Sequence, residues 1–418
     1  MANTMAPAVP VGKNHAGWAS WENRLLLLSA VLMVAFEIGV CWVGRRTSLD
    51  GRVDFKAFYC AGRLLLLGRG GEVYSAATQH AIQGGVLGLQ GQTLPFLYPA
   101  FAALLFVPLA LLPYRYAFVV WMLCNLVVFA VAVRLLVREG SILEGLPPAV
   151  RYLLFAVPLA VAMALMQGQI TFLLLLVFVA VNRLFRRGAH FLAGLVLALA
   201  LVKFQLAVPV ALLFFGWRCY RVFAGFMLGA AGLSLVSVGV CGRSAMLAYG
   251  RSLLRIGQTT WVAPGAAQGR YGMFAGDMPN LHGLCFTLLA GRPAGVWMAV
   301  AASILVMLWA WRQPPSLAVA LPAAMLVSYH MQAYDLVLLL VPMTLAAGRP
   351  PQSAGREGRD TTLRLHRSKL LAAALVLMSP PVAAWLLVKG LLSLLAGAVL
   401  LVLVAGADLP WPAFAEPD

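Results

Sequence analysis

Long stretches of this chain consist of apolar residues with almost no charge. Residues 24–43, 123–137 and 370–388 are clear examples, each rich in Leu, Val and Ala. A helix needs about 20 mostly apolar residues to cross the ~30 Å hydrocarbon core of a bilayer. Backbone polar groups in lipid must bond to one another, which helices achieve within a single segment. The pattern predicts an all-α membrane protein, a polytopic helical bundle with about 11–12 transmembrane helices.

The composition supports the same class. Hydrophobic residues make up 62% of the 418 residues and charged residues only 11%, whereas soluble domains have about 45–50% apolar and about 25% charged residues. The net charge of +17 comes from basic residues that lie between the apolar runs. Such residues contact lipid headgroups and set topology. We therefore expect membrane lipids as partners and no nucleic acid.

Clusters of basic residues give the expected orientation. Arginines follow the apolar runs 170–181 and 206–217, and six basic residues lie within residues 348–369. The positive-inside rule assigns these clusters to the cytoplasm. Counting spans from them makes residues 45–115 the first extracytoplasmic loop. Within it, Pro99 and Pro108 interrupt the apolar segment 98–112, which favours a re-entrant or interfacial helix.

The whole chain, residues 1–418, is predicted to be a single integral membrane domain. Residues 24–347 form its core, residues 348–368 a flexible cytoplasmic linker, and residues 369–407 the C-terminal helices. Residues 241–280 are expected to form a second outer loop. The runs 191–202 and 206–217 are short for spans, so they form either two arms that meet near Lys203 or one long bent helix.

Polar groups beside apolar helices are costly, so they are functional candidates. With this topology, nine of them fall at the outer ends of spans, which predicts one shared pocket. They are Asp54, Gln167, Gln169, Lys203, Gln205, Asn280, His282, His330 and Asp335.

Asp54 lies between Arg52 and Lys56 and is followed by aromatic residues. A carboxylate in such surroundings could act as the general base for a hydroxyl group. The alternative is a solvated loop acid paired with one of its basic neighbours. Asp50 and Asp54 could also form a metal-binding pair, but no third ligand is evident, so no cofactor is predicted and a divalent metal stays an open alternative.

The other polar residues have two interpretations each. Lys203 could bind a phosphate or could extend its amine to the membrane interface. His330 could donate to a phosphate or bond to the backbone of its turn. Gln167 and Gln169 could bind sugar hydroxyls or cap the ends of two helices.

Short fragments spread over residues 50–345 resemble, in their order, the GT-C membrane glycosyltransferases, in particular glycosyltransferase family 87. That family includes mycobacterial polyprenyl-phosphate-mannose-dependent mannosyltransferases. The fragments are Asp54-Phe55, Ala57-Phe58-Tyr59, Gly68 through Val73-Tyr74, Leu97-Tyr98-Pro99, Pro108-Leu109, Trp121, Gly168-Gln169, Lys203-Phe204-Gln205, Pro279-Asn280, Ser328-Tyr329-His330 and Tyr334-Asp335. The chain has Tyr98-Pro99-Ala100 where the family often has Tyr-Pro-Pro, and Ser328-Tyr329 where related chains often have Ser-Pro.

The resemblance implies a GT-C type bundle with interfacial helices in the first outer loop. Asp54 matches the catalytic base of the family, and His330 matches a histidine near the donor phosphate. Lys203, Arg52 and Lys56 are expected to bind phosphate or lipid with His330. The residues expected to contact sugar or acceptor are Tyr59, Tyr98, Gln167, Gln169, Gln205, Asn280, His282, Tyr334 and Asp335.

The predicted function is transfer of a sugar, with mannose as the expected one, from a polyprenyl-phosphate donor to a lipid or glycan acceptor. Transfer is expected on the extracytoplasmic side of a bacterial cytoplasmic membrane, with inversion at the anomeric carbon. The main alternative is a lipid-linked glycan flippase or another secondary transporter, although the sequence shows no repeated halves. A non-catalytic assembly subunit is a third interpretation.

Overall fold

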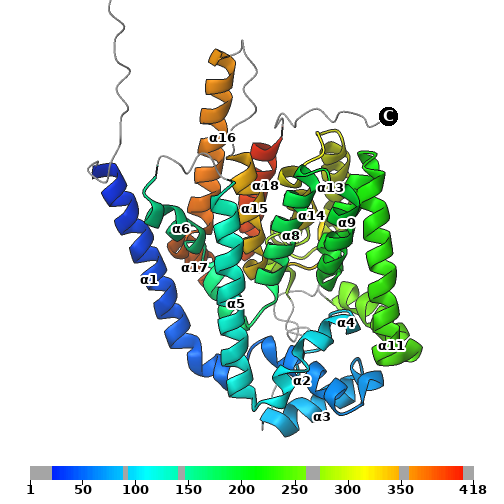
Figure 1. Cartoon of the computed structure of the whole chain (residues 1–418). Coiled ribbons are helices and arrows are strands. Elements are labelled where there is room, and N and C mark those ends of the chain that lie inside the picture. Colours follow the sequence, from blue (N-terminus) through cyan, green and yellow to red (C-terminus); the bar gives the residue numbers. More distant parts are fainter. Residues whose placement is uncertain (1–20, 88–92, 140–145, 260–273, 348–356, 408–418) are drawn as a thin grey trace, which may run out of the picture.

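The computed structural model describes residues 21–87, 93–139, 146–259, 274–347 and 357–407. In these residues the chain forms helices and contains no strand, as Figure 1 shows. Long helices include α1 (Trp21–Leu49), α5 (Tyr114–Val137), α11 (Tyr220–Thr259) and α13 (Ala294–Trp311). The other bundle helices are α6 (Pro148–Ala156), α7 (Ala160–Gln167), α8 (Thr171–Arg186), α9 (His190–Leu197), α10 (Phe204–Gly216), α12 (Leu281–Leu288), α14 (Leu317–Val327), α15 (Leu340–Ala346), α16 (Glu357–Met378), α17 (Pro380–Val388) and α18 (Ala396–Gly406).

In the described part of the chain, five helical stretches have the length and hydropathy of membrane spans. Two bent pairs, α6 with α7 and α16 with α17, raise the number to 7 if each pair counts as one span, and shorter apolar helices lie beside them. The predicted polytopic helical fold is confirmed. Its five to seven candidate spans are fewer than the eleven or twelve expected, because apolar runs form bent pairs, with angles of 60° and 51°, or helices too short to count as full spans.

The apolar stretch from residue 190 to residue 216 turns back on itself. It consists of α9, the 3₁₀ helix η5 (Ala198–Lys203) and α10. The ring of Phe185 lies 5.1 Å from that of His190, at the start of the stretch. It lies equally close, at 5.1 Å, to the ring of Phe214 near the end. Both ends therefore lie together, and the chain reverses at Lys203, where the backbone is non-helical (φ −122°, ψ 73°). The two-arm interpretation is the one observed.

A layer of short helices covers one end of the bundle (Figure 1). It contains α2 (Phe55–Leu66), η1 (Gly70–Glu72), α3 (Ala76–Leu87), α4 (Ala100–Ala103), η2 (Leu104–Phe106) and η3 (Leu109–Leu111). We call these elements the cap layer. Residues 98–112, expected as one interfacial helix, form the last three of these elements instead. Pro99 precedes α4 and Pro108 precedes η3, where a proline ring starts a helical turn readily but does not continue one.

The cap layer and the basic helix ends lie at opposite ends of the bundle. The helix α5 starts at the cap layer and carries Arg134 in its last turn. The helix α8 carries Arg183 and Arg186 in its last turn, away from the cap layer (Figure 1). This arrangement agrees with the separation that the basic clusters predicted.

One segment differs from the sequence expectation, and another lies partly outside the described residues. The second outer loop was expected from residue 241, but α11 continues to Thr259 with a break at Gly242 (φ 77°, ψ 163°), which glycine tolerates. Cys241, just before the break, and Ala245 and Tyr249 in the second arm are buried, and the last two lie four residues apart on one helix face. Residues 260–273 and 348–356 lie outside the described residues, and α16 begins within the segment expected to be a linker.

The crossing of α9 and α11 depends on glycine. A Cβ atom at Gly225 would overlap the backbone oxygen of Phe191, and one at Gly194 would overlap that of Val222. Small residues let helix backbones approach closely in membranes, where van der Waals packing drives helix association. This contact holds the arm that leads to Lys203.

Replacing Gly225 by alanine should lower the melting temperature in detergent, because overpacking a tight contact costs about 1–3 kcal/mol. Gly232 is the matched control on the same helix, since nothing lies within 4 Å of a Cβ built there. Gly232→Ala should leave the melting temperature unchanged or raise it through helix propensity. Equal melting temperatures for the two variants would contradict the packing described here.

Candidate functional site

The first helix of the cap layer is held by an aromatic cluster. Phe55, at the first position of α2, is fully buried. Its ring lies 5.4 Å from that of Phe118, 5.5 Å from that of Tyr114 and 6.1 Å from that of Phe106. Aromatic pairs at such distances add about 0.5–1.5 kcal/mol each beyond the area they bury. The position of the preceding residue, Asp54, is therefore fixed by packing.

A tight turn of the bundle docks on the same point. It contains Gln167, Gly168 and Gln169, and joins α7 to α8. Gly168 has a left-handed conformation (φ 63°), and a Cβ atom there would lie 2.7 Å from the Cβ of Phe55. The side-chain oxygen of Gln167 accepts a hydrogen bond of 3.1 Å from the backbone N–H of Asp54. The turn thus binds the main chain directly beside the candidate acid.

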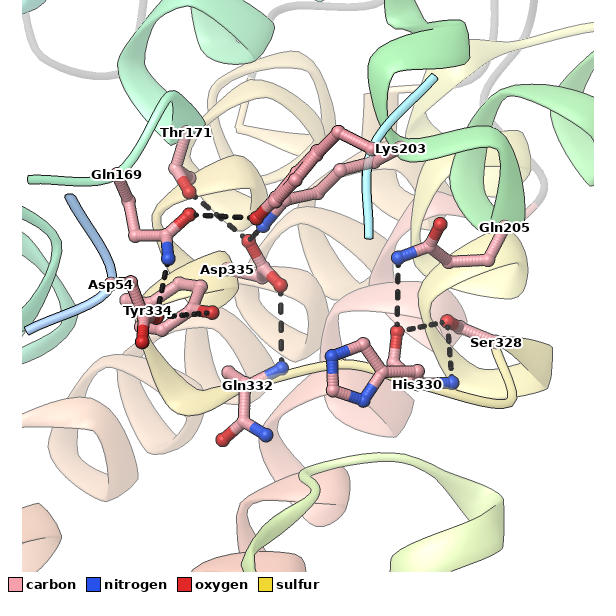
Figure 2. A network of polar contacts seen from close by, with 11 residues as sticks. Asp54, Gln169, Thr171, Lys203, Gln205, Ser328, His330, Gln332, Tyr334 and Asp335 are labelled. Carbon is pink, nitrogen blue, oxygen red and sulfur yellow. Dashed lines mark hydrogen bonds and ion pairs between the residues drawn. The ribbon is translucent and has the colours of Figure 1, made fainter. Parts of the chain in front are cut away.

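The carboxylate of Asp54 faces the bundle (Figure 2). Gln169 donates to its Oδ2 at 2.5 Å, and the hydroxyl of Tyr334 donates to the same atom at 3.2 Å. Asp54 stands directly before α2 but its side chain makes no helix-capping bond, although aspartate at this position usually does. Burial raises the pKa of Asp54 above its usual value, while the bonds from Gln169 and Tyr334 and the charge of Lys203 lower it. The acid is partly exposed to a cavity.

Behind Asp54 lies a buried ion pair between Lys203 and Asp335. Both side chains are almost completely buried. Thr171 donates to Oδ1 of Asp335 at 3.1 Å, and the backbone N–H of Gln332 donates to Oδ2 at 3.3 Å. The ammonium of Lys203 also lies 4.8 Å from the centre of the Tyr334 ring. The pair joins η5 to η7 (Ala333–Leu339), and the charge of each residue is balanced by the other.

His330 lies in a turn whose backbone is fixed by neighbouring side chains. Its carbonyl oxygen accepts bonds from Ser328 Oγ at 2.7 Å and from Gln205 Nε2 at 3.3 Å. Asn280 donates to the carbonyl of Ser328 at 2.7 Å and so joins α12 to this turn. The ring Nδ1 is buried without a hydrogen-bond partner among the described residues. Burial and then the charge of Lys203 lower the pKa of His330 to about 4, so its imidazole is neutral at pH 7.

These groups surround a cavity of about 380 Å³ between the cap layer and the bundle. Its polar wall contains Asp54, Arg52 and the two glutamines of the docking turn, with His330 nearby. Its apolar wall contains Leu94, Leu97, Val202 and Leu253. A site of this size and mixed lining can bind a polar group attached to a hydrocarbon chain.

Nine of the residues singled out from the sequence line this cavity: Arg52, Asp54, Tyr98, Gln167, Gln169, Lys203, Gln205, His330 and Tyr334. Five others do not. Tyr59 donates to the carbonyl of Leu112 at 2.7 Å and holds α2 to the end of the cap layer. Lys56 is buried within α2, and burial lowers its pKa. Asn280 caps α12 and Asp335 binds Lys203, so both support the cavity from behind. His282 lies on α12, close enough to lower the pKa of His330.

Sequence reasoning missed two polar residues of the site. Gln332 lines the cavity and Thr171 supports Asp335. Both follow a predicted residue by two positions, His330 in the first case and Gln169 in the second, so proximity along the chain was the available signal.

The metal alternative relied on Asp50 together with Asp54. In the structure Asp50 is partly exposed and binds Arg115 at 2.8 Å. Across the described residues, no group of three His, Cys, Asp or Glu side chains lies together in a way that could hold a metal ion.

Comparison with known families decides the class of protein. The sequence model of glycosyltransferase family 87 matches residues 96–342, more than half of the chain. The chain belongs to glycosyltransferase family 87. This protein is therefore a membrane glycosyltransferase, and the resemblance drawn from its short motifs is confirmed. No curated protein and no solved structure matches the chain.

The family 87 match covers only one side of the cavity. Gln169, Lys203, His330 and their neighbours lie inside residues 96–342, whereas Asp54 precedes them. The structure brings the acid to the matched region through the docking turn.

Breaking the Lys203–Asp335 pair should destabilise the enzyme strongly. Lys203→Met leaves the Asp335 carboxylate buried without its partner, a change that typically costs about 3–5 kcal/mol. The double variant Lys203→Met with Asp335→Asn should regain much of the loss, because neither charge remains. Melting temperatures in detergent test this. A double variant no more stable than Lys203→Met would argue against a shared role of the two charges.

Proposed function

We propose that this glycosyltransferase transfers a sugar, mannose being the expected one, from a polyprenyl-phosphate donor to a glycolipid or glycan acceptor. The observation that carries the proposal is the mixed lining of the cavity. A carboxylate, an imidazole ring and an arginine line the same space as leucine and valine side chains. A nucleotide donor would not need the apolar wall, whereas a lipid-linked donor would.

The donor phosphate is proposed to bind at His330 and Arg52. The neutral imidazole can donate one N–H to a phosphate oxygen, and Arg52 is exposed at the cavity. Lys203 was a candidate for the same role, but its charge is paired with Asp335. We propose that Lys203 contributes indirectly, by keeping η5 and η7 together beside the cavity.

Asp54 is proposed to act as general base. It removes the proton of the acceptor hydroxyl while that oxygen attacks the anomeric carbon. The bond between the anomeric carbon and the phosphate oxygen breaks, its electron pair stays with the phosphate, and polyprenyl phosphate leaves. The new bond forms on the face opposite the departing phosphate, so the anomeric carbon is inverted.

The extracytoplasmic side is supported by charge. The arginine-rich ends of α5 and α8 lie away from the cap layer (Figure 1), and short basic loops favour the cytoplasm. The cavity would then open toward the outer face of a bacterial cytoplasmic membrane.

Asp54→Asn should abolish transfer by purified enzyme in lipid nanodiscs, with a loss of about 10²–10⁴-fold in kcat. Release of polyprenyl phosphate from a synthetic polyprenyl-phosphate mannose is the readout. Asp50→Asn is the matched control, because Asp50 is a partly exposed acid four residues away whose carboxylate is paired with Arg115. Full activity of Asp54→Asn would contradict the proposed base. Movement of intact donor across the bilayer without release of polyprenyl phosphate would indicate a flippase.

A further inference from the structure

The two oxygens of the Asp54 carboxylate differ in their surroundings. Gln169 and Tyr334 both donate to Oδ2. No described residue donates to Oδ1, although the side chain faces the cavity. A carboxylate oxygen offers two lone-pair sites, so Oδ2 is fully occupied and Oδ1 is available.

The amide of Gln169 can adopt only one useful orientation. The hydroxyl of Tyr98 donates to its Oε1 at 3.1 Å, while its Nε2 faces Oδ2 of Asp54. An ionised carboxylate only accepts hydrogen bonds, so the flipped amide would put two acceptors against each other. The Asp54 carboxylate therefore sets the orientation, and the hydroxyl of Tyr98 supports it by donating to Oε1.

The backbone that carries Gln169 is held independently of Asp54. Trp121 donates to the carbonyl of Gly168 at 2.8 Å, and Asn125 donates to the carbonyl of Gln169 at 3.1 Å. Both donors lie on α5 and both are buried. Gln169 is itself buried. Because these buried contacts hold Gln169, its amide can donate to Asp54 without reorganising during the reaction.

We propose that Gln169, oriented by Tyr98, is a positioning residue that binds Oδ2 of Asp54 and leaves Oδ1 as the atom that takes the acceptor proton. This inference rests on the proposed function of Asp54 as general base. It assigns the two side chains a role in directing the base, in place of the sugar or acceptor contact expected from the sequence.

Gln169 should also favour the ionised form of the base. The titratable and charged groups that act on the pKa of Asp54 are Tyr334 and Asp335 from η7 and Lys203 from η5. Asp54 in turn acts on the pKa of Tyr98, before α4, and of Lys56, on α2. Lys203 and Asp335 oppose each other, since one lowers and the other raises the pKa of Asp54. The bond from Gln169 is the largest influence that lowers this pKa. Loss of this hydrogen bond should therefore raise the pKa of Asp54. The acid limb of the pH profile of kcat should then move to higher pH.

The test is the pH dependence of kcat in nanodiscs for the wild type, Gln169→Ala, Gln169→Glu and Tyr98→Phe. Gln169→Ala should raise the acid limb by about one pH unit, which is the effect of one hydrogen bond to a charged group. At neutral pH its kcat should fall on the order of tenfold, with a much smaller change in the KM of the donor. Gln169→Glu should shift the limb further, because two adjacent carboxylates share one proton. Tyr98→Phe should shift it least.

Gln205→Ala is the matched control. Gln205 is a second glutamine of the cavity wall, but it binds the backbone of His330 and does not contact Asp54. Its loss should leave the acid limb where it is in the wild type, whatever it does to the rate. Melting temperatures identify any variant that fails to fold. If Gln169→Ala does not fold, the test uses Tyr98→Phe and Gln169→Glu, which keeps the shape of the side chain.

The outcomes separate this inference from the proposed function. An acid limb that coincides in the wild type and all three variants, with Asp54→Asn inactive, overturns the positioning role and leaves the base in place. A wild type without sugar transfer, or an active Asp54→Asn, overturns the proposed function itself. Shifted limbs in the Gln169 variants and an unshifted limb in Gln205→Ala support the inference.

Discussion

The contact between the docking turn and the start of α2 determines how the two parts of this enzyme fit together. One residue of the turn binds the backbone of Asp54, the next packs on Phe55, and the third binds the carboxylate. The turn belongs to the bundle, while α2 belongs to the cap layer. A single short segment therefore fixes the candidate base relative to every group contributed by α8, η5 and η7. Left-handed backbone at Gly168 allows the close approach, which a side chain at that position would prevent.

The buried pair of Lys203 and Asp335 explains why charge can be kept beside an apolar bundle. Each residue alone would carry a large desolvation cost, and together they still need further hydrogen bonds, which Thr171 and the backbone of Gln332 provide. The pair lies where two apolar runs leave regular α-helix, at the reversal after α9 and at η7. Irregular backbone is tolerated in a membrane protein where it is buried in protein or lines a cavity. The same irregularity brings Tyr334 to Asp54.

Much of the site could be predicted from the sequence, because its polar residues fall at the span ends that the topology places on one side. Arginine clusters orient the spans, and this alone gathers Asp54, Gln169, Lys203 and His330 at one end, where the cavity is found. The ion pair between Lys203 and Asp335 could not be predicted. The two residues are 132 positions apart, and hydropathy carries no information on which buried charges meet. The number of spans was also beyond reach, since a hydropathy run does not reveal where a backbone bends, as between α6 and α7. Family motifs indicated the class of enzyme, but the roles of Tyr59 and Asn280 became visible only through their hydrogen bonds.

We propose that a lipid-linked sugar binds between Asp54 and His330. The most direct measurement is an electron cryomicroscopy structure of the enzyme with a polyprenyl-phosphonate mannose, in which a carbon atom replaces the bridging oxygen and blocks transfer. We predict that the phosphonate lies within hydrogen-bonding distance of the His330 ring and Arg52. The anomeric carbon should face the side of Oδ1 of Asp54, and the lipid should run along Leu94, Leu97 and Leu253. A phosphonate bound elsewhere, or a sugar outside this cavity, would contradict the account.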